Sequence, residues 1–292
     1  MRVLLTGCNG QVGFLLKQML TNKVELLALT RQELDISNEN LVTESINSFK
    51  PDVVINAAAY TAVDKAENEK ELAFAVNSDG PEYLAKAANK FNAALIHIST
   101  DYVFEGNKAG LYVETDPVNP QGIYGKSKLA GEVAVKGHCD QHIILRTAWV
   151  FGEHGNNFVK TMLSLGKERD KLSIVSDQFG GPTYAGDIAA TIIKIVKKFE
   201  ADENINWGVY HYSGMPHVSW YEFAQNIFAK AKGNELLDSI PTLTAITTKE
   251  FPTSAKRPEN SKLNSEKIER EFGVMPSDWQ AELDNIKNYI PM

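Results

Sequence analysis

A tyrosine and a lysine stand four residues apart in the segment from Tyr124 to Lys128 (YGKSK). On a helix, this spacing projects both side chains from one face. A tyrosine hydroxyl can donate a proton to the alkoxide that forms when a carbonyl accepts a hydride, and a nearby lysine ammonium lowers the tyrosine pKa. The same lysine can bind the ribose of a nicotinamide cofactor. The pair predicts carbonyl reduction, although many helices carry this spacing without any chemistry.

Two hydroxyl side chains, Ser99 and Thr100, end an apolar segment upstream of this pair. Parallel sheets bind their ligands at the carboxyl ends of strands. A hydroxyl in that place can form a hydrogen bond with a substrate carbonyl or with the tyrosine. Because residues alternate along a strand, only one of the two can face the site, and spacing does not decide which.

Three glycines, Gly7, Gly10 and Gly13, lie between an apolar segment and an amphipathic one. Glycines at such a position permit a tight turn and let backbone N–H groups approach a pyrophosphate, and the following helix N-terminus adds a partial positive charge. Turn glycines are common, so the triplet alone is a weak signal. Its position after the first expected strand favours a dinucleotide-binding loop.

Arg31 follows the second expected strand, where NAD-selective sites offer a carboxylate to the ribose. A guanidinium can pair with a 2′-phosphate, so the sequence predicts NADPH as the preferred cofactor, with NADH possible. The alternative is that Arg31 is only a surface cation. Small residues, Ala57 to Ala59, follow the third strand and let a cofactor lie against the backbone, or else serve helix–sheet packing.

The elements that must position these residues alternate along the first half of the chain. We expect strands over 2–6, 24–30, 53–56, 94–99 and 142–146, and helices over 12–20, 40–49, 81–89 and 124–135. This alternation predicts an α/β fold with a Rossmann-like, doubly wound parallel sheet. Helices expected over 157–167, 185–198, 220–232 and 278–289 lie among Gly-, Pro- and aromatic-rich segments. We therefore expect an NADP-binding domain over 1–150, to which later segments return, and mainly a smaller C-terminal substrate-binding lobe over 151–292.

Composition excludes several other classes of protein. The net charge of -7 and the pI of about 5.5 argue against nucleic-acid binding. No segment approaches the ~20 apolar residues that a membrane span needs. Cys8 and Cys139 belong to no ligand set, so zinc is not expected. Scarce cysteine and the lack of a signal peptide predict a cytoplasmic protein.

Taken together, these motifs resemble those of the dTDP-4-dehydrorhamnose reductase family, which belongs to the extended short-chain dehydrogenases/reductases. The most specific matches are residues 56–67 (NAAAYTAVDKAE), 99–104 (STDYVF) and 257–261 (RPENS). Residues 7–13, 124–132, 146–151, 155–160 and 177–183 match as well.

The resemblance implies reduction of the 4-keto group of dTDP-4-dehydro-L-rhamnose by NADPH, the last step of dTDP-rhamnose biosynthesis, which supplies polysaccharide biosynthesis. It implies that Tyr124 is the proton donor, that Lys128 is its partner, and that Thr100 tunes the tyrosine pKa. Patterns and resemblance together predict these cofactor contacts: Gly7, Gly10, Gln11, Val12, Gly13, Arg31, Asp35, Ile36, Ala57, Ala58, Ala59, Tyr124 and Lys128. The predicted substrate contacts are Thr100, Asp101, Trp149, Asn157, Arg257 and Asn260.

Two of these predictions have alternatives. The Arg257 guanidinium suits a diphosphate, but it could equally form a structural salt bridge.

Some members of the family place a glutamate two residues after the third glycine, where it helps to bind Mg²⁺ at a dimer interface. This chain has Leu15 there, which cannot ligate a hard cation, so we expect no metal. The oligomeric state, monomer or homodimer, is left open. His97 lies in an apolar segment and is expected to be packed rather than catalytic.

Other functions share part of this pattern. A nucleotide-sugar epimerase or a different 4-keto reductase has the same glycine loop and Tyr/Lys pair, but an epimerase returns its hydride and consumes no NADPH. A non-catalytic module of the methionine adenosyltransferase regulatory-subunit type has a related fold. The presence of Thr100, Tyr124 and Lys128 together argues against a decayed site.

Overall fold

The computed structural model describes residues 1–201 and 203–289, and within them six parallel strands form the main sheet. Their spatial order is β10-β5-β4-β3-β1-β2, so the chain builds outward from β1 in both directions. The strands are β1 (Arg2–Thr6), β2 (Glu25–Leu29), β3 (Val53–Asn56), β4 (Ala94–Thr100), β5 (His142–Thr147) and β10 (Gly208–His211). The direction of winding reverses between β1 and β3, which is where open α/β sheets bind ligands.

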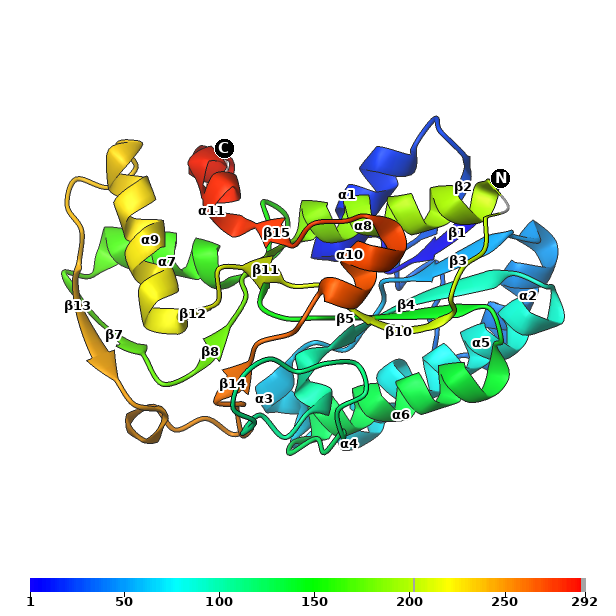
Figure 1. Cartoon of the computed structure of the whole chain (residues 1–292), viewed down its shortest axis with the longest axis horizontal. Helices are drawn as coiled ribbons and strands as arrows, with labels where there is room; N and C mark the ends of the chain where they lie inside the picture. Colours follow the sequence, from blue (N-terminus) through cyan, green and yellow to red (C-terminus); the bar gives the residue numbers. More distant parts are fainter. Residues whose placement is uncertain (202, 290–292) are drawn as a thin grey trace.

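Helices cover both faces of this sheet (Figure 1). The helices are α1 (Gln11–Leu20), α2 (Glu39–Phe49), α5 (Gly80–Lys90), α6 (Ile123–His138) and α8 (Ala185–Glu200). Alternate strand residues point to opposite faces. In β1, Val3 and Leu5 pack with α1 and α8, whereas Leu4 packs on the side of α2 and α5. The predicted doubly wound α/β fold is confirmed.

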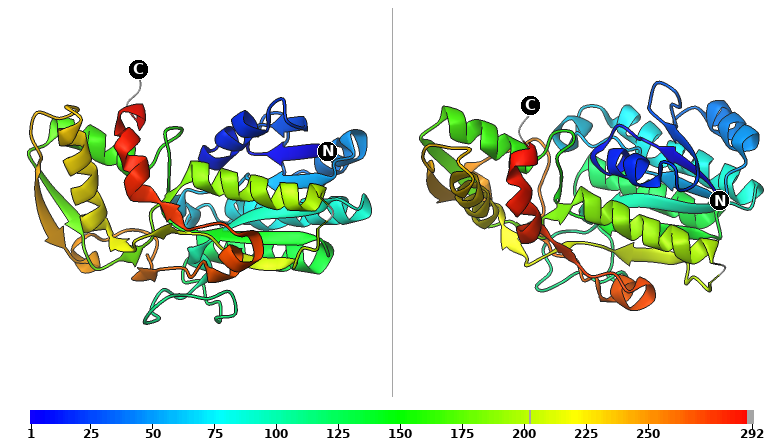
Figure 2. Two further views of the ribbon diagram at one scale, coloured as in Figure 1. Left: turned by 45° about the horizontal axis from the view of Figure 1, so that its top comes forward. Right: turned by 90° about the horizontal axis from the view of Figure 1, so that it is seen from above.

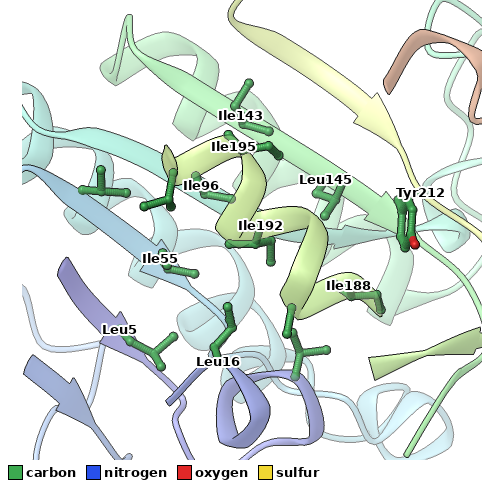
Figure 3. Packing of buried hydrophobic residues seen from close by; sticks show 14 of the residues in the cluster. Leu5, Leu16, Ile55, Ile96, Ile143, Leu145, Ile188, Ile192, Ile195 and Tyr212 are labelled. Carbon is green, nitrogen blue, oxygen red and sulfur yellow. The ribbon is translucent and has the colours of Figure 1, made fainter. Parts of the chain in front are cut away.

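Helix α8 lies well beyond residue 150 in sequence, yet it packs on the sheet of the first half. Figure 3 shows Ile188, Ile192 and Ile195 of α8 over Ile55 and Ile96 of the strands. Their spacing of four and three residues places them on one face of the helix. The apolar stripe of α8 therefore belongs to the main core.

The chain also returns to the sheet as a strand. β10 pairs in parallel with β5, with Gly208 opposite Ile143. The sequence analysis missed this strand, because its four residues (GVYH) show no apolar run. The expected boundary near residue 150 falls just after β5, and the chain crosses between sheet and lobe several times (Figure 2).

A smaller lobe beside the sheet has its own apolar core. Helices α7 (Phe158–Glu168) and α9 (Trp220–Gly233) pack through Met162, Phe223 and Phe228. The strands β7 (Lys171–Val175) and β13 (Thr242–Ile246) pair in parallel along one side. The helix expected over 278–289 is instead α11 (Trp279–Glu282) followed by the 3-10 helix η4 (Leu283–Tyr289), with non-helical backbone at Asn285. Residues 202 and 290–292 of the expected lobe lie outside the described residues.

Short elements connect these parts. The segment between β3 and α5, for which the sequence predicted no element, contains α3, α4 and the π-helical turn η1. The short elements are α3 (Val63–Ala66), α4 (Lys70–Phe74), η1 (Ala75–Asp79), η2 (Asp101–Val103), β6 (Val150–Phe151), β8 (Phe179–Gly180), β9 (Thr183–Tyr184), β11 (Gly214–Met215), β12 (Val218–Ser219), η3 (Thr248–Glu250), β14 (Asn260–Ser261), α10 (Glu266–Phe272) and β15 (Ser277–Asp278). Among the described helices, none has the length and apolar character that crossing a membrane requires.

A buried ion pair fixes α6 on the sheet. The Arg146 side chain of β5 donates from Nε to Glu132 Oε1 (2.8 Å) and from Nη2 to Glu132 Oε2 (2.6 Å). Ser99 Oγ donates to the same Oε1 at 2.7 Å. The Arg146 and Glu132 side chains are 2% and 0% exposed, so neither charge has water to replace a lost partner.

We predict that Glu132→Gln lowers the free energy of unfolding by ~3–5 kcal/mol, because it leaves the Arg146 charge buried without a counter-charge. Urea denaturation at neutral pH measures the loss. The matched control is Glu82→Gln, which breaks the exposed Glu82–Lys86 pair and should cost less than about 1 kcal/mol. Equal losses in the two variants would contradict this account of the α6 anchor.

Candidate active site

The loop between β1 and α1 has a backbone that only glycine permits at two positions. Gly7 has φ +68°, and a Cβ there would lie 2.5 Å from the Ala58 nitrogen. A Cβ on Gly13 would lie 2.2 Å from the Gly7 oxygen. Because both residues lack a Cβ, the turn packs against the end of β3 and α1 packs against the turn. The α1 N-terminus at Gly10 is thereby placed at the switch point of the sheet, where it can receive a phosphate.

Two adjoining cavities run along this loop. One of about 500 Å³ and one of about 370 Å³ share the lining residues Asn9, Gly10, Ala57 and Ala59. The larger cavity is also lined by Gln11, Val12, Tyr124 and Lys128. The smaller cavity is also lined by Gly7, Arg31, Asp35, Ile36 and Ala58. Two connected cavities meeting at a glycine turn suit the two halves of a dinucleotide. Of the predicted cofactor residues, Gly13 alone does not line them; it packs beneath the turn.

The smaller cavity contains the groups expected around an adenosine. The Asp35 carboxylate accepts hydrogen bonds from the Ser37 N–H (3.0 Å) and hydroxyl (2.7 Å), and these lower the pKa of Asp35. Ile36 is buried beside it. Arg31 lines the same cavity, whereas the first carboxylate after β2, that of Glu33, does not line it and accepts from the Thr30 N–H at 2.8 Å. The residues present therefore fit a cofactor with a 2′-phosphate.

The three residues of the predicted reaction centre, Thr100, Tyr124 and Lys128, line the larger cavity together. The structure distinguishes the two hydroxyls that end β4. Ser99 gives its hydrogen bond to Glu132, away from the site, while Thr100 lies within reach of the Tyr124 hydroxyl. Thr100 Oγ1 also donates to Asp101 Oδ1 at 3.0 Å. Geometry therefore places Thr100 at the tyrosine, where the sequence pattern had left two candidates.

The electrostatics of Tyr124 differ from the sequence expectation. Burial raises the pKa of Tyr124 above its usual value, and hydrogen bonding to Thr100 only partly opposes this. Lys128 is itself buried, and burial lowers the pKa of Lys128 to about 8, with Glu132 opposing. Its Nζ donates to the Ile98 carbonyl at 2.7 Å. The lysine therefore does not ionise the phenol in this state, and Tyr124 keeps the proton that a reductase must donate.

Asp101 presents an unpartnered carboxylate oxygen at the same cavity. The residue is 3% exposed, and Oδ2 has no hydrogen-bond partner among the described residues. Burial raises the pKa of Asp101 to about 6. A buried polar atom without a partner is costly, so this oxygen is available to a ligand hydroxyl.

Trp149 also lines the larger cavity, and its backbone is in the left-handed region with φ 50°. Its ring stacks on Trp220 at 3.5 Å between centroids and 9° between planes. The position of Gly180 leaves room for the indole, since a Cβ there would lie 2.5 Å from it. A strained backbone held in place by packing often marks a ligand-binding position.

A third cavity of about 730 Å³ lies in the lobe, and Trp220 forms part of its lining. Cations and aromatic rings line it together: Phe158, Arg169, Lys171, Trp220, Phe251 and Arg257. Arg257 Nη2 also donates to Asp64 Oδ2 at 2.7 Å. Arg257 therefore forms the predicted salt bridge and also lines a cavity, so the two alternatives predicted for this side chain do not exclude each other.

Two predicted substrate residues are not brought to a cavity. Asn157 donates to the Gly152 carbonyl (2.6 Å) and caps α7 by accepting from the Lys160 N–H. Asn260 donates to the Lys108 and Gly110 carbonyls at 2.6 and 2.7 Å. The side-chain amides of Asn157 and Asn260 therefore form hydrogen bonds with other parts of the fold.

The sequence analysis overlooked Thr147 at the carboxyl end of β5. Thr147 lies opposite Thr100 in the sheet register and lines the larger cavity. Its hydroxyl is buried without a partner among the described residues. The rule that ligands bind at strand carboxyl ends would have indicated it, because residues 142–146 were already expected as a strand.

A parallel sheet with a glycine turn at its switch point, and a Tyr/Lys pair on the helix after β4, defines a short-chain dehydrogenase/reductase. The RmlD substrate binding domain model matches residues 1–290, and the chain belongs to that family.

Relatives of known identity cover essentially the whole chain. A dTDP-4-dehydrorhamnose reductase of Aggregatibacter actinomycetemcomitans is 52% identical over 290 residues, which is 99% of either chain. The crystal structure of a Clostridium acetobutylicum dTDP-4-dehydrorhamnose reductase has a TM-score of 0.92, with 41% identity and complete coverage of both chains. That of the Bacillus anthracis enzyme in complex with NADP has a TM-score of 0.89, with 37% identity and 98% coverage of both chains.

We predict that Arg31→Ala weakens NADP⁺ binding ~10–100-fold, because a charge-assisted hydrogen bond to a phosphate contributes ~1.5–3 kcal/mol. Binding of NAD⁺, which lacks the 2′-phosphate, should stay the same. Isothermal titration of both cofactors measures the difference. The control is Arg270→Ala, which removes an exposed arginine of α10. An equal loss for NAD⁺ and NADP⁺ would contradict a specific role for Arg31.

Proposed function

We propose that the protein reduces the 4-keto group of dTDP-4-dehydro-L-rhamnose with NADPH and releases dTDP-L-rhamnose. The observation that carries this proposal is the meeting of Thr100, Tyr124 and Lys128 in a cavity continuous with the glycine turn. The relatives named above support the choice of substrate, since their names specify this reductase.

Bound NADPH supplies the hydride, and residues of the chain supply and position the proton. Tyr124 holds a proton at its hydroxyl and delivers it to the alkoxide oxygen that forms at C4 of the sugar. Thr100 lies within reach of the phenol, and its hydroxyl, which donates to Asp101 here, can turn to contact the same oxygen. Lys128 replaces the proton that Tyr124 gives up. Thr100 and Lys128 are buried, and the low dielectric around them strengthens these contacts.

We place the sugar beside Asp101 and Trp149, and the nucleotide in the lobe cavity. The free oxygen of Asp101 suits a sugar hydroxyl, and the Trp149 ring supplies a flat apolar wall. In the lobe cavity, Arg169, Lys171 and Arg257 offer positive charge to a diphosphate, and the aromatic rings suit a base. The stacked pair Trp149 and Trp220 joins the two sites.

This activity assigns the protein to the last step of dTDP-rhamnose biosynthesis, with a dTDP-sugar as its partner molecule. A cytoplasmic location follows from the source of NADPH and nucleotide sugars. We retain the monomer and the homodimer as the two expected assemblies, and we expect the reaction to need no metal. Among the described residues, no group of three His, Cys, Asp or Glu side chains could hold a metal ion.

The first experiment follows absorbance at 340 nm with NADPH and dTDP-4-dehydro-L-rhamnose. Tyr124→Phe should lower kcat by ~10²–10⁴-fold, because it removes the proton donor. Tyr83→Phe on α5, which lies outside the cavities, is the control. Absence of oxidation by the wild type would favour an epimerase, which consumes no NADPH, or a binding module. Undiminished oxidation by Tyr124→Phe would overturn the proton donor but keep the reductase.

We predict an acid limb near pH 6 in the profile of kcat/KM, because the pKa of Asp101 is raised to about 6. As the pH falls through this value, Asp101 is protonated and its carboxylate can no longer accept from the sugar. Asp101→Asn should lower the plateau and abolish the limb. Asp187→Asn, at a half-buried carboxyl outside the cavities whose pKa burial also raises, should keep it. Persistence of the limb in Asp101→Asn would assign it to another group.

A further inference from the structure

A row of polar side chains crosses the centre of the sheet on the face that α6 covers. Thr6 of β1 lies opposite Asn56 of β3, and Asn56 lies opposite His97 of β4. Lys128 of α6 ends the row, with Nζ 3.3 Å from His97 Nε2. All four residues are at most 1% exposed. A polar row in such a core is costly unless every group is paired, so its hydrogen bonds have determined directions.

Asn56 determines which groups of the row donate hydrogen bonds and which accept them. The Ala58 N–H, which can only donate, gives its hydrogen bond to Asn56 Oδ1 at 3.2 Å. Thr6 Oγ1 donates to the same oxygen at 2.7 Å. The amide nitrogen of Asn56 must therefore face His97, and it lies 3.0 Å from Nδ1. Since an amide nitrogen only donates, Nδ1 must accept, and a neutral imidazole then carries its proton on Nε2.

This tautomer has a consequence for Lys128. The Nε2–H of His97 points at the Lys128 nitrogen, and an ammonium has no lone pair with which to accept it. A neutral amine satisfies both contacts, because it accepts from His97 and donates to the Ile98 carbonyl at 2.7 Å. A doubly protonated imidazole is disfavoured, since burial holds the pKa of His97 well below its usual value.

We propose that His97, held by Asn56 with its proton on Nε2, is a positioning residue that stabilises the neutral amine of Lys128 and so lets Lys128 exchange protons near neutral pH. In the reaction of the proposed function, on which this role rests, a lysine that exchanges readily can return a proton to the Tyr124 phenolate and recover one from solvent. A lysine whose neutral form is stabilised is the stronger acid, so it passes its proton to the phenolate more readily than an unperturbed ammonium would.

The other ionisable groups around Lys128 do not replace this effect. Glu132, one turn further along α6, favours the ammonium, but Arg146 of β5 and Ser99 of β4 share its charge. Tyr124 of α6 and Asp101 of η2 face the cavity beyond the lysine. Burial lowers the pKa of Lys128 to about 8, in the direction that the row also favours.

The tautomer can be measured directly in the cofactor-free protein. With ¹⁵N-labelled histidine, His97 should give the shifts of a neutral ring with Nε2 protonated, unchanged between about pH 6 and 9. The chain has six histidines, and His97→Phe identifies the signal by its loss. A wild-type ring with its proton on Nδ1 would overturn the proposal, and this outcome needs no enzyme activity.

Asn56→Asp tests the coupling. The carboxylate still accepts from Ala58 and Thr6, but it now accepts from Nδ1–H as well, so the tautomer should reverse. His97 Nε2 would then accept from the Lys128 ammonium. The titration of Lys128 should itself give kcat/KM a basic limb. In Asn56→Asp we expect this limb and the Lys128 titration, followed by ¹³Cε NMR, both to move upward by about one pH unit or more.

Thr6→Val is the matched control. It removes the far end of the row, but Ala58 still orients Asn56, so tautomer and limb should stay unchanged. A reversed tautomer in Asn56→Asp without a shift of the Lys128 titration would refute the coupling. Lower activity with both readouts unchanged would leave the row a purely structural element. If no reductase activity is found, the proposed function fails, while the two NMR titrations still decide the role of His97.

Discussion

The buried carboxylate of Glu132 is the constraint on which the active site depends. Tyr124, Lys128 and Glu132 are spaced four residues apart, so they form one stripe along α6. The same stripe therefore carries the proposed proton donor Tyr124, its proposed partner Lys128 and the anchor Glu132. The two-point contact with Arg146 fixes both the rotation and the height of the helix on the sheet. Small errors in that docking would move the phenol relative to the cofactor cavity, and catalysis tolerates little displacement.

Apolar runs along the chain were enough to predict the first five strands and the longer helices between them, α1, α2, α5 and α6, but not the short helices α3 and α4. They did not reveal β10, whose four residues are held by pairing with β5 rather than by their own pattern. The glycine spacing predicted the tight turn after β1, because Gly7 has a positive φ and Gly13 packs against the Gly7 carbonyl. Local requirements of this kind are visible in sequence, whereas a strand stabilised by its neighbour is not.

Site residues were harder to predict where the same side chain can serve two purposes. Ser99 and Thr100 are both hydroxyls at a strand end, and only the position of Glu132 separates them. Asn260 looks like a ligand-binding amide in the sequence, but two backbone carbonyls consume its donors. The pKa of Tyr124 is not lowered as expected, because burial raises it and at the same time lowers the pKa of the neighbouring Lys128. Such balances depend on surroundings contributed by distant segments.

The return of α8 to the sheet has a consequence for how the chain acquires its structure. One face of the sheet, with Leu5, Ile55 and Ile96, is covered by a helix that begins at Ala185. As the chain leaves the ribosome, that face stays open to water until the lobe segment after β5 has also emerged. The nucleotide-binding half is therefore not a unit that matures first. The sheet can bury this face completely only after α8 has been made, so until then part of its apolar surface is open to chaperones and to other unfolded chains.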